Sequence, residues 1–275
     1  MAVMSILNNL TCPAVMGILN VTPDSFSDGG DFFSPEKALS HALQMVKEGA
    51  SIIDIGGEST RPGAAVISID EELSRVIPVI EAIRAEADVP ISIDTSKPAV
   101  MQAAVSAGAS MINDVRALQE EGALNVAAEL QVPVCLMHMQ GKPQTMQLAP
   151  EYDDIVSQVK AFLQQRIDLS TAAGLPRELI VVDPGFGFGK TLAHNQALLR
   201  GLEQLLEFNL PMLVGISRKS MIAHMLDLPV DERLYGSISL ASVAVWQGAS
   251  IIRAHDVAAT LQAVRVSYMC RTAGK

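Results

Sequence analysis

Short apolar runs that each end in a polar or charged cluster recur along this chain. Eight such runs can be distinguished, and the clusters at their ends differ in sequence. The carboxyl ends of parallel strands meet at one mouth of a barrel, so polar clusters in this position predict an active site assembled there. The runs with their polar ends span residues 17–20, 53–60, 91–96, 111–114, 136–139, 181–190, 214–219 and 251–256.

The segments between these runs predict helices. Residues 49–54, 108–113 and 248–253 each open with Gly-Ala-Ser and continue into an apolar strand, and glycine at this point accepts the left-handed conformation that ends a helix. One helix is further indicated by an apolar stripe at helical spacing, made of Ile155, Val159, Phe162, Leu163 and Ile167. Strand and helix alternate about eight times, at roughly one unit per 30 residues, as repeated βαβ units require. The chain is therefore predicted to fold as an α/β protein, a TIM (β/α)8 barrel with a single domain over residues 1–275.

Two of the predicted strand-to-helix loops are long. Residues 21–35 consist almost wholly of turn-forming residues with three phenylalanines among them, and residues 57–69 are similar. Loops longer than about 12 residues in a compact domain are usually functional or disordered, so we interpret both as lids over the mouth. The alternative is two mobile surface loops whose phenylalanines pack locally.

Composition narrows the setting in which such a barrel works. The chain has 275 residues, 49% of them hydrophobic, and its net charge of −10 argues against nucleic acid or an anionic membrane as a partner. Its longest apolar runs, such as 210–216, are far shorter than a membrane span of about 20 residues, and residues 1–7 lack the basic start of a secretory signal. Cys12, Cys135 and Cys270 show no metal-binding spacing. They suit a reducing compartment, so we expect a cytoplasmic protein.

Two basic groups close together predict an anion site. Arg253 and His255 are two positions apart, so in a strand both side chains point to the same face, here into the mouth. Side by side they suit a phosphate or diphosphate, and Asn20 at the end of the first run is placed to assist. In the alternative interpretation Arg253 pairs with Asp256, and His255 is a hydrogen-bonded core histidine.

Three polar residues at equivalent strand ends predict a ligand rich in hydrogen-bond donors. Asp94, Asn113 and Asp183 come from three different runs, and buried carboxylates are costly unless they are paired or hydrogen-bonded. A heterocycle with an amino group and ring N–H donors would satisfy them. Two alternatives stay open. One is salt bridges to Lys219 or Arg218, and the other is ligation of a metal, which needs several oxygens within about 2.6 Å.

The lysine at the end of the seventh run has two candidate roles. Lys219 can act as a Schiff-base nucleophile if burial lowers its pKa, or as a fixed donor to a carbonyl or ring nitrogen. The glycine-rich segment 183–190 is not a Walker P-loop, because its glycines have a different spacing. Its glycines let the backbone approach a flat ligand, and Phe186 or Phe188 is available for stacking.

Five motifs tie these features together. They are GILNVTPDSFSDGG (17–30), GESTRPG (57–63), DPGFGFGK (183–190), SRKS (217–220) and RAHD (253–256). In sequence and order they resemble the motifs of the bacterial dihydropteroate synthase family, and the resemblance extends from about residue 14 to 265. It implies a TIM barrel that joins 6-hydroxymethyl-7,8-dihydropterin diphosphate to p-aminobenzoate, giving 7,8-dihydropteroate and pyrophosphate. It also implies Mg²⁺ as cofactor, sulfonamides as inhibitors and a homodimer.

The resemblance further implies roles for individual residues. The pterin ring would be held by Asp94, Asn113, Asp183 and Lys219, with Phe188 beside it. The diphosphate would be bound by Asn20, Thr60, Arg253 and His255, of which Asn20 also contacts Mg²⁺. With the two loops closed, the p-aminobenzoate pocket would be formed by Phe26, Asp28, Arg61, Pro62, Phe188 and Ser217. The groups expected to carry the chemistry are Asp94, Asp183, Lys219, Arg253 and His255. Segment 137–139 has no role in this scheme, and we expect Met137 to pack under the ring.

The implied reaction needs no strong general base. The diphosphate departs first, in an SN1-like step, and the arylamine that attacks is already uncharged at neutral pH. On this scheme Lys219 is a hydrogen-bond donor. Three other functions stay in view: a folate-dependent methyltransferase barrel, a paralogue that binds pterin without catalysis, and a Schiff-base aldolase on the same fold.

Overall fold

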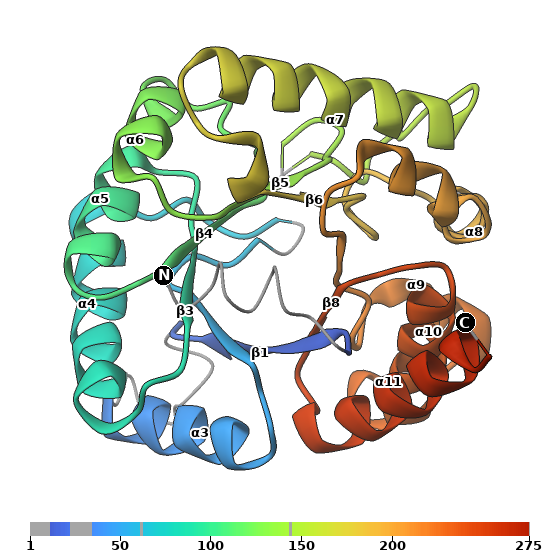
Figure 1. Ribbon diagram of the computed structural model, residues 1–275, viewed down its shortest axis with the longest axis horizontal. Helices are drawn as coiled ribbons and strands as arrows, with labels where there is room; N and C mark the ends of the chain where they lie inside the picture. The colour runs from blue at the N-terminus through green and yellow to red at the C-terminus, as the bar shows by residue number, and fades with distance from the viewer. Residues whose placement is uncertain (1–11, 23–34, 61–62, 143–144, 275) are drawn as a thin grey trace.

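Eight parallel strands form the centre of the computed structural model, which describes residues 12–22, 35–60, 63–142 and 145–274 (Figure 1). Their order is β6-β5-β4-β3-β2-β1-β8-β7. A parallel bridge between Val182 in β6 and Met212, which directly precedes β7, closes this order into a ring and confirms the predicted barrel. The strands are β1 Ala14–Asn20, β2 Ile52–Gly56, β3 Ile91–Asp94, β4 Met111–Asp114, β5 Val134–Met137, β6 Ile180–Asp183, β7 Leu213–Val214 and β8 Ile251–Ala254.

Helices surround the barrel and alternate with the strands (Figure 1). The helix predicted from the apolar stripe is α7, and two helices follow β7. The described helices are α3 Pro35–Lys47, α4 Ile69–Glu86, α5 Pro98–Ser106, α6 Ala123–Leu130, α7 Ile155–Ala172, α8 Leu192–Arg200, α9 Ser220–Leu226, α10 Leu234–Trp246 and α11 Val257–Thr272. Three short 3₁₀ helices, η1 Arg177–Leu179, η2 Leu202–Phe208 and η3 Val230–Glu232, complete the connections.

The three Gly-Ala-Ser segments turn the chain from helix into strand as predicted. Gly49, Gly108 and Gly248 have φ angles of 100°, 118° and 106°, and they follow α3, α5 and α10. Glycine adopts this left-handed conformation without the steric cost that a side chain imposes. Each turn leads directly into a strand, so it sets where that strand starts and which of its residues face inward.

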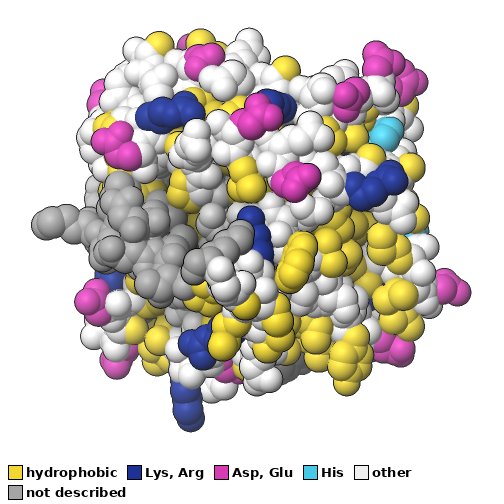
Figure 2. Space-filling model, turned by 45° about the vertical axis from the view of Figure 1, so that its right-hand side comes forward, with side chains coloured by type: hydrophobic (Ala, Val, Ile, Leu, Met, Phe, Trp, Pro, Cys, Tyr) yellow, Lys and Arg dark blue, Asp and Glu magenta, His cyan; other side chains and the backbone are white. Residues whose placement is uncertain are grey.

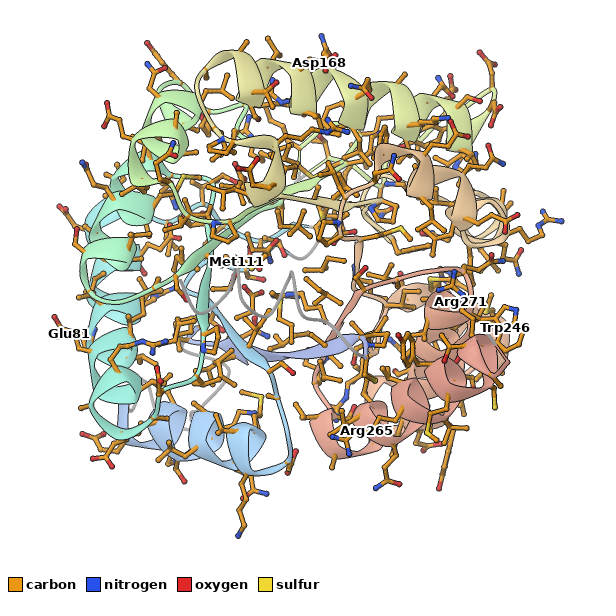
Figure 3. All side chains as sticks on the ribbon, in the orientation of Figure 1. Glu81, Met111, Asp168, Trp246, Arg265 and Arg271 are labelled. Atoms are coloured by element: carbon orange, nitrogen blue, oxygen red, sulfur yellow. The ribbon has the colours of Figure 1, made fainter. Side chains whose placement is uncertain are left out.

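The interior of the barrel is apolar at one end and charged at the other. A separate core cluster fills its apolar part, and Met111 of that cluster lies at the centre of the ring in Figure 3. Strand residues two positions apart share a face, so the next inward positions lie toward the carboxyl ends of the strands. On β2, β4, β6 and β8 those positions are Asp54, Asn113, Asp183 and Arg253.

The loops differ from the prediction in extent. β7 is limited to two residues, and the glycine after it already belongs to the connection toward α9. Residues 23–34 and 61–62 lie outside the described residues, so the assignment of both long loops as lids stays a prediction. None of the described helices combines the length and the apolar character needed to cross a membrane.

Candidate active site

The charged end of the barrel brings together side chains from six strands and the loop after a seventh. Four of these side chains are almost completely shielded from solvent, with exposures between 0% and 8%. They are Asp54, Asp94, Asn113 and Asp183. Their register follows from the parallel pairing, since Asp94 lies opposite Asn113 on one side and Gly56 on the other. A buried array of this kind is stable only if its members bond to one another or to a ligand.

Arg253 on β8 is held by two carboxylates, which come from β2 and β3. Its Nε donates to Asp54 Oδ2 at 2.6 Å, and its Nη2 donates to Asp94 Oδ2 at 2.8 Å. Burial acts to lower the pKa of this guanidinium, but the two carboxylates outweigh burial and raise it. The alternative pairing with Asp256 is wrong, because Asp256 accepts hydrogen bonds from Arg218, with Nε at 3.0 Å.

Asp54 is a site residue that sequence reasoning did not assign. Its Oδ2 also accepts a hydrogen bond from Asn113 Nδ2 at 3.0 Å. A carboxylate only accepts hydrogen bonds when ionised, so it fixes the orientation of the Asn113 amide and leaves Asn113 Oδ1 as the acceptor for a ligand. The sequence feature that could have identified it is its spacing on β2. Asp54 lies two positions after Ile52, which belongs to the inner apolar cluster, so its side chain also faces the inside of the barrel.

Asp94 has one satisfied oxygen and one unsatisfied oxygen. Oδ2 receives the Arg253 bond, whereas Oδ1 is buried without a hydrogen-bond partner among the described residues. Burial raises the pKa of Asp94 to about 7, Arg253 opposes this shift, and the charge of Asp54 adds to it. An unsatisfied buried carboxylate oxygen is expensive, and a donor on a ligand in the mouth would remove this cost. The pairing of Asp94 with Arg253 replaces the predicted alternative of a salt bridge to Lys219 or Arg218.

Lys219 is a fixed donor in this arrangement. Its Nζ donates to the carbonyl oxygen of Phe186 at 2.6 Å and lies 4.6 Å from the centre of the Phe188 ring. Burial lowers the pKa of Lys219 to about 8, while the Asp183 carboxylate opposes that shift. Burial likewise raises the pKa of Asp183, and Lys219 works against it. The two residues therefore form an electrostatic pair beside an aromatic face.

The two candidate stacking residues have different positions. Phe186 is completely buried in the core and contributes only its carbonyl oxygen to the mouth, whereas Phe188 is half-buried and presents its ring to Lys219. Met137 is almost fully buried at the end of β5, in register with Asp183. Its position at the mouth agrees with the expected packing under a ring.

His255 follows β8 directly and contacts the loop after β7. Its Nδ1 lies 3.0 Å from Ser217 Oγ, and its backbone N–H donates to the same oxygen at 3.2 Å. Since Ser217 Oγ accepts from the backbone, its own hydrogen is available for Nδ1. Arg253 and His255 are thus adjacent at the mouth as predicted, but Arg253 points into the barrel and His255 sits at its rim.

The loop after β2 is anchored by a partly buried ion-pair cluster. Lys97 Nζ donates to Glu58 Oε2 at 3.0 Å and to Glu72 Oε2 at 2.5 Å, and Ile67 N donates to Glu58 Oε1 at 3.0 Å. Thr60 lies in this loop and is partly exposed. The cluster therefore fixes where the backbone leaves β2 toward Thr60. Four residues of the predicted p-aminobenzoate pocket or its loops, Phe26, Asp28, Arg61 and Pro62, lie outside the described residues.

Asn20 is the residue that could hold a metal ion. It ends β1 and lies opposite Gly56 of β2 in the register. No group of three His, Cys, Asp or Glu side chains converges on an ion site within the described ranges. Mg²⁺ often keeps several waters and takes only one or two protein oxygens together with substrate phosphates. One amide oxygen at the rim therefore fits Mg²⁺ that binds together with a diphosphate.

Comparison with known proteins identifies the family. The model of a family described as pterin binding enzyme matches residues 16–255. Dihydropteroate synthase of Escherichia coli K12 is 56% identical over 258 residues, which cover 94% of this chain and 92% of that protein. The Haemophilus influenzae dihydropteroate synthase is 53% identical, with 94% of each chain covered.

Two solved structures match over nearly their whole length. A Yersinia pestis dihydropteroate synthase in a sulfonamide drug complex has a TM-score of 0.92 and 53% identity, with 96% of each chain covered. The Xanthomonas albilineans dihydropteroate synthase in complex with 7,8-dihydropteroate has a TM-score of 0.87 and 46% identity, covering 96% of this chain and 95% of that one. Sequence, fold and motifs agree, and the chain belongs to the pterin-binding enzyme family as one of its dihydropteroate synthases.

Proposed function

We propose that this chain condenses 6-hydroxymethyl-7,8-dihydropterin diphosphate with p-aminobenzoate, with the residue roles set out below. The observation that carries the proposal is the buried array at the mouth, in which Asp94 Oδ1 has no partner among the described residues. Asn113 Oδ1 and the Asp183 carboxylate are further acceptors, and Lys219 Nζ is a donor. An aminopyrimidine edge with N–H groups and a carbonyl oxygen complements such a set.

The ring would lie between Met137 and the Phe188 side of the mouth. Asp94 and Asp183 would accept its N–H donors, and the ammonium of Lys219 would donate to its carbonyl or ring nitrogen. Each bond removes part of the cost of burying these groups without a ligand. Lys219 then needs no covalent role, because its ammonium is already placed as a donor toward Phe186.

The diphosphate would lie at the rim, where His255 and Thr60 are found. Arg253 would reach it through Nη1, the guanidinium nitrogen that makes no hydrogen bond within the described part of the chain. Asn20 would contribute its amide oxygen to Mg²⁺. When bound, the ion neutralises charge that the departing diphosphate gains.

The proposed reaction follows from the placement of the pterin ring inside the mouth and of the diphosphate at its rim. The bond between the exocyclic methylene carbon and the diphosphate oxygen breaks, and its electron pair leaves with the diphosphate. Positive charge then spreads into the ring, where Asp94 and Asp183 stabilise it. The amine nitrogen of p-aminobenzoate forms the new C–N bond with its lone pair and afterwards loses one proton. Ser217, Phe188 and the two long loops would shape the p-aminobenzoate pocket and exclude water, which competes for the cation. Sulfonamides would occupy the same pocket.

The test is release of pyrophosphate from the pterin diphosphate, measured with and without p-aminobenzoate and Mg²⁺. We expect 7,8-dihydropteroate formation to require the pterin diphosphate, p-aminobenzoate and Mg²⁺. Pyrophosphate release should require the pterin diphosphate and Mg²⁺ and should be faster with p-aminobenzoate, which traps the cation. Lys219→Met should abolish turnover, whereas Lys160→Met should not, because Lys160 forms an exposed ion pair with Glu207 on the outside of the barrel. A folded wild-type chain that releases no pyrophosphate would refute the proposed activity.

A second copy of this chain is the partner that we infer for an exposed apolar surface over its C-terminal helices. Large hydrophobic side chains with exposures from 38% to 77% gather over α9, η3, α10 and α11 (Figure 2). Trp246 projects from the outer edge of α10 in Figure 3. The residues concerned are Met225, Leu226, Val230, Tyr235, Val243, Trp246, Val266 and Met269. A patch of this kind on one face suits a two-fold homodimer interface. The cytoplasm is the compartment expected from the scattered cysteines.

A further inference from the structure

A lysine outside the proposed substrate contacts is buried behind the glycine-rich loop. Lys190 is 3% exposed, and its Nζ lies 2.9 Å from His138 Nδ1. The same ammonium donates to the carbonyl oxygens of Gly185 at 2.8 Å and Phe188 at 3.0 Å. A fourth acceptor, the carbonyl oxygen of His138, lies farther away at 3.4 Å. An ammonium has three protons to donate, so the three nearer acceptors match its capacity.

The acceptors of Lys190 surround the backbone group that meets Lys219. Gly185 and Phe188 lie on either side of Phe186, whose carbonyl oxygen accepts the Lys219 bond at 2.6 Å. Lys190 therefore binds the loop at Gly185 and Phe188, and the loop contacts Lys219 through Phe186, which lies between these two residues. The bond to Phe188 also fixes the backbone from which the Phe188 ring extends, and Lys219 Nζ lies over that ring.

The shape of this loop depends on hydrogen bonds to side chains. Besides Lys190, Asp183 Oδ1 accepts from Gly185 N at 2.7 Å, and the Tyr152 hydroxyl donates to the Gly189 carbonyl oxygen at 2.9 Å. Gly185, Gly187 and Gly189 all have left-handed φ angles, of 70°, 82° and 62°, and glycine is the residue with the greatest backbone freedom. The chain here is neither helix nor strand, so its buried carbonyl groups depend on side chains for hydrogen bonds. Asn195 supports the middle of the loop, where its Oδ1 accepts from Gly187 N at 2.8 Å.

Lys190 is buried without a hydrogen bond to a carboxylate among the described residues. All three of its close acceptors are neutral, and a buried ammonium without a bonded carboxylate lowers stability relative to an apolar side chain. His138 is suited to be an acceptor, because burial and then Lys190 lower the pKa of its imidazole to about 3 and keep it neutral. It packs edge-on against Phe162, with ring centres 4.9 Å apart. His138 thus connects the loop to the end of β5.

We propose that Lys190 is a positioning residue for the pterin pocket, acting with His138 to aim the Phe186 carbonyl and the Phe188 ring at Lys219. The proposal rests on the proposed function, since it assigns Lys219 to the pterin ring. It also gives the end of β5 a role, which the motifs alone did not provide.

The test compares Lys190→Met with two changes at its anchor. His138→Leu removes the acceptor, and His138→Asn retains an oxygen near the position of Nδ1. We expect Lys190→Met and His138→Leu to raise the KM for pterin diphosphate by about tenfold or more, because a misplaced site loses charge-assisted bonds. The KM for p-aminobenzoate should rise less than that for the pterin diphosphate, because Phe188 is only one of several groups proposed for its pocket. His138→Asn should restore most of the loss. Lys160→Met is the matched control.

Each outcome decides the proposal. If Lys190→Met does not fold, His138→Leu carries the test, since Lys190 then keeps both loop carbonyls. Folded variants with wild-type KM values, or with equal increases for both substrates, overturn the positioning role while leaving the activity established. A wild-type chain without pyrophosphate release overturns the proposed function and this inference together.

Discussion

Asp54→Asn tests the electrostatic arrangement of the mouth most directly. The side chain is completely buried, and one of its oxygens serves both Arg253 Nε and Asn113 Nδ2. Asparagine preserves the shape of the residue and removes its charge. The change therefore weakens the hold on Arg253 without opening a cavity, and Arg253 keeps its second carboxylate, Asp94.

The magnitude follows from the hydrogen bonds involved. A bond to a charged group contributes about 1.5–3 kcal/mol, and a neutral bond about 0.5–1.5 kcal/mol, so the substitution costs about 1–2 kcal/mol. If Arg253 exerts this effect in the transition state, kcat/KM falls about 5- to 30-fold. A second effect has a defined sign. The charge of Asp54 raises the pKa of Asp94, which is about 7. Removing that charge lowers the pKa, and the acid limb of the pH profile moves to lower pH.

The assay is pyrophosphate release at saturating p-aminobenzoate, followed from about pH 5.5 to 9. This range spans the shifted pKa values of Asp94, about 7, and Lys219, about 8. Asp168→Asn is the matched control, because Asp168 is exposed on α7 and accepts a hydrogen bond from Gln164. A folded Asp54→Asn variant whose kcat/KM and acid limb both match those of wild type would refute the reasoning.

Three further outcomes can be measured. First, kcat/KM for the pterin diphosphate should rise through about pH 7, as Asp94 ionises, and fall through about pH 8, as Lys219 loses its proton; a flat profile between these limits contradicts both roles. Second, Gly185→Ala should cost about 2–4 kcal/mol in urea unfolding, because its Cβ would lie 1.8 Å from a backbone oxygen. Gly63→Ala, with a similar φ of 79° and no atom of the described residues within 4 Å of the added Cβ, should cost only about 1–2 kcal/mol. Third, Trp246→Lys should shift the chain toward monomer in sedimentation velocity, and an unchanged sedimentation coefficient would place any dimer interface elsewhere.

The fold was predictable because local signals repeat along the chain. The φ angles at Gly49, Gly108 and Gly248 and the apolar runs after them each specify one helix-to-strand unit. These signals can be recognised without knowledge of contacts between distant residues. A barrel follows once the unit recurs with parallel strands. Two-residue periodicity also predicted which end of each strand carries the polar groups, and so brought Asp94, Asn113 and Asp183 together correctly.

The partners within the site were not predictable in this way. Arg253 is 199 residues from Asp54 and 159 residues from Asp94 along the chain, and these contacts exist only because the barrel closes. From the sequence, Asp256 was a nearer and equally plausible acceptor. The direction of Phe186 and Phe188 was also out of reach, since it depends on three left-handed glycines and on Lys190 behind them. Long-range closure and loop backbone angles leave little trace in local residue patterns.

The charges at the mouth explain why such a site can favour a cation at one end of its substrate and an anion at the other. Three buried carboxylates, Asp54, Asp94 and Asp183, face two partly buried cations, Arg253 and Lys219. Within this group of five, one negative charge is in excess when all are ionised. In the proposed reaction the ring becomes positive as its bond to the diphosphate breaks, and it meets this excess negative charge. The rim beyond carries His255, whose Nδ1 and backbone N–H contact Ser217 Oγ, and a basic side chain at the rim suits the diphosphate. Interactions that strengthen as charge separates lower the barrier, whereas equal binding of substrate and transition state would not. The carboxylates lie inside the barrel and the basic group lies at its rim. This separation therefore favours bond breaking in which the ring becomes positive and the diphosphate takes the electron pair.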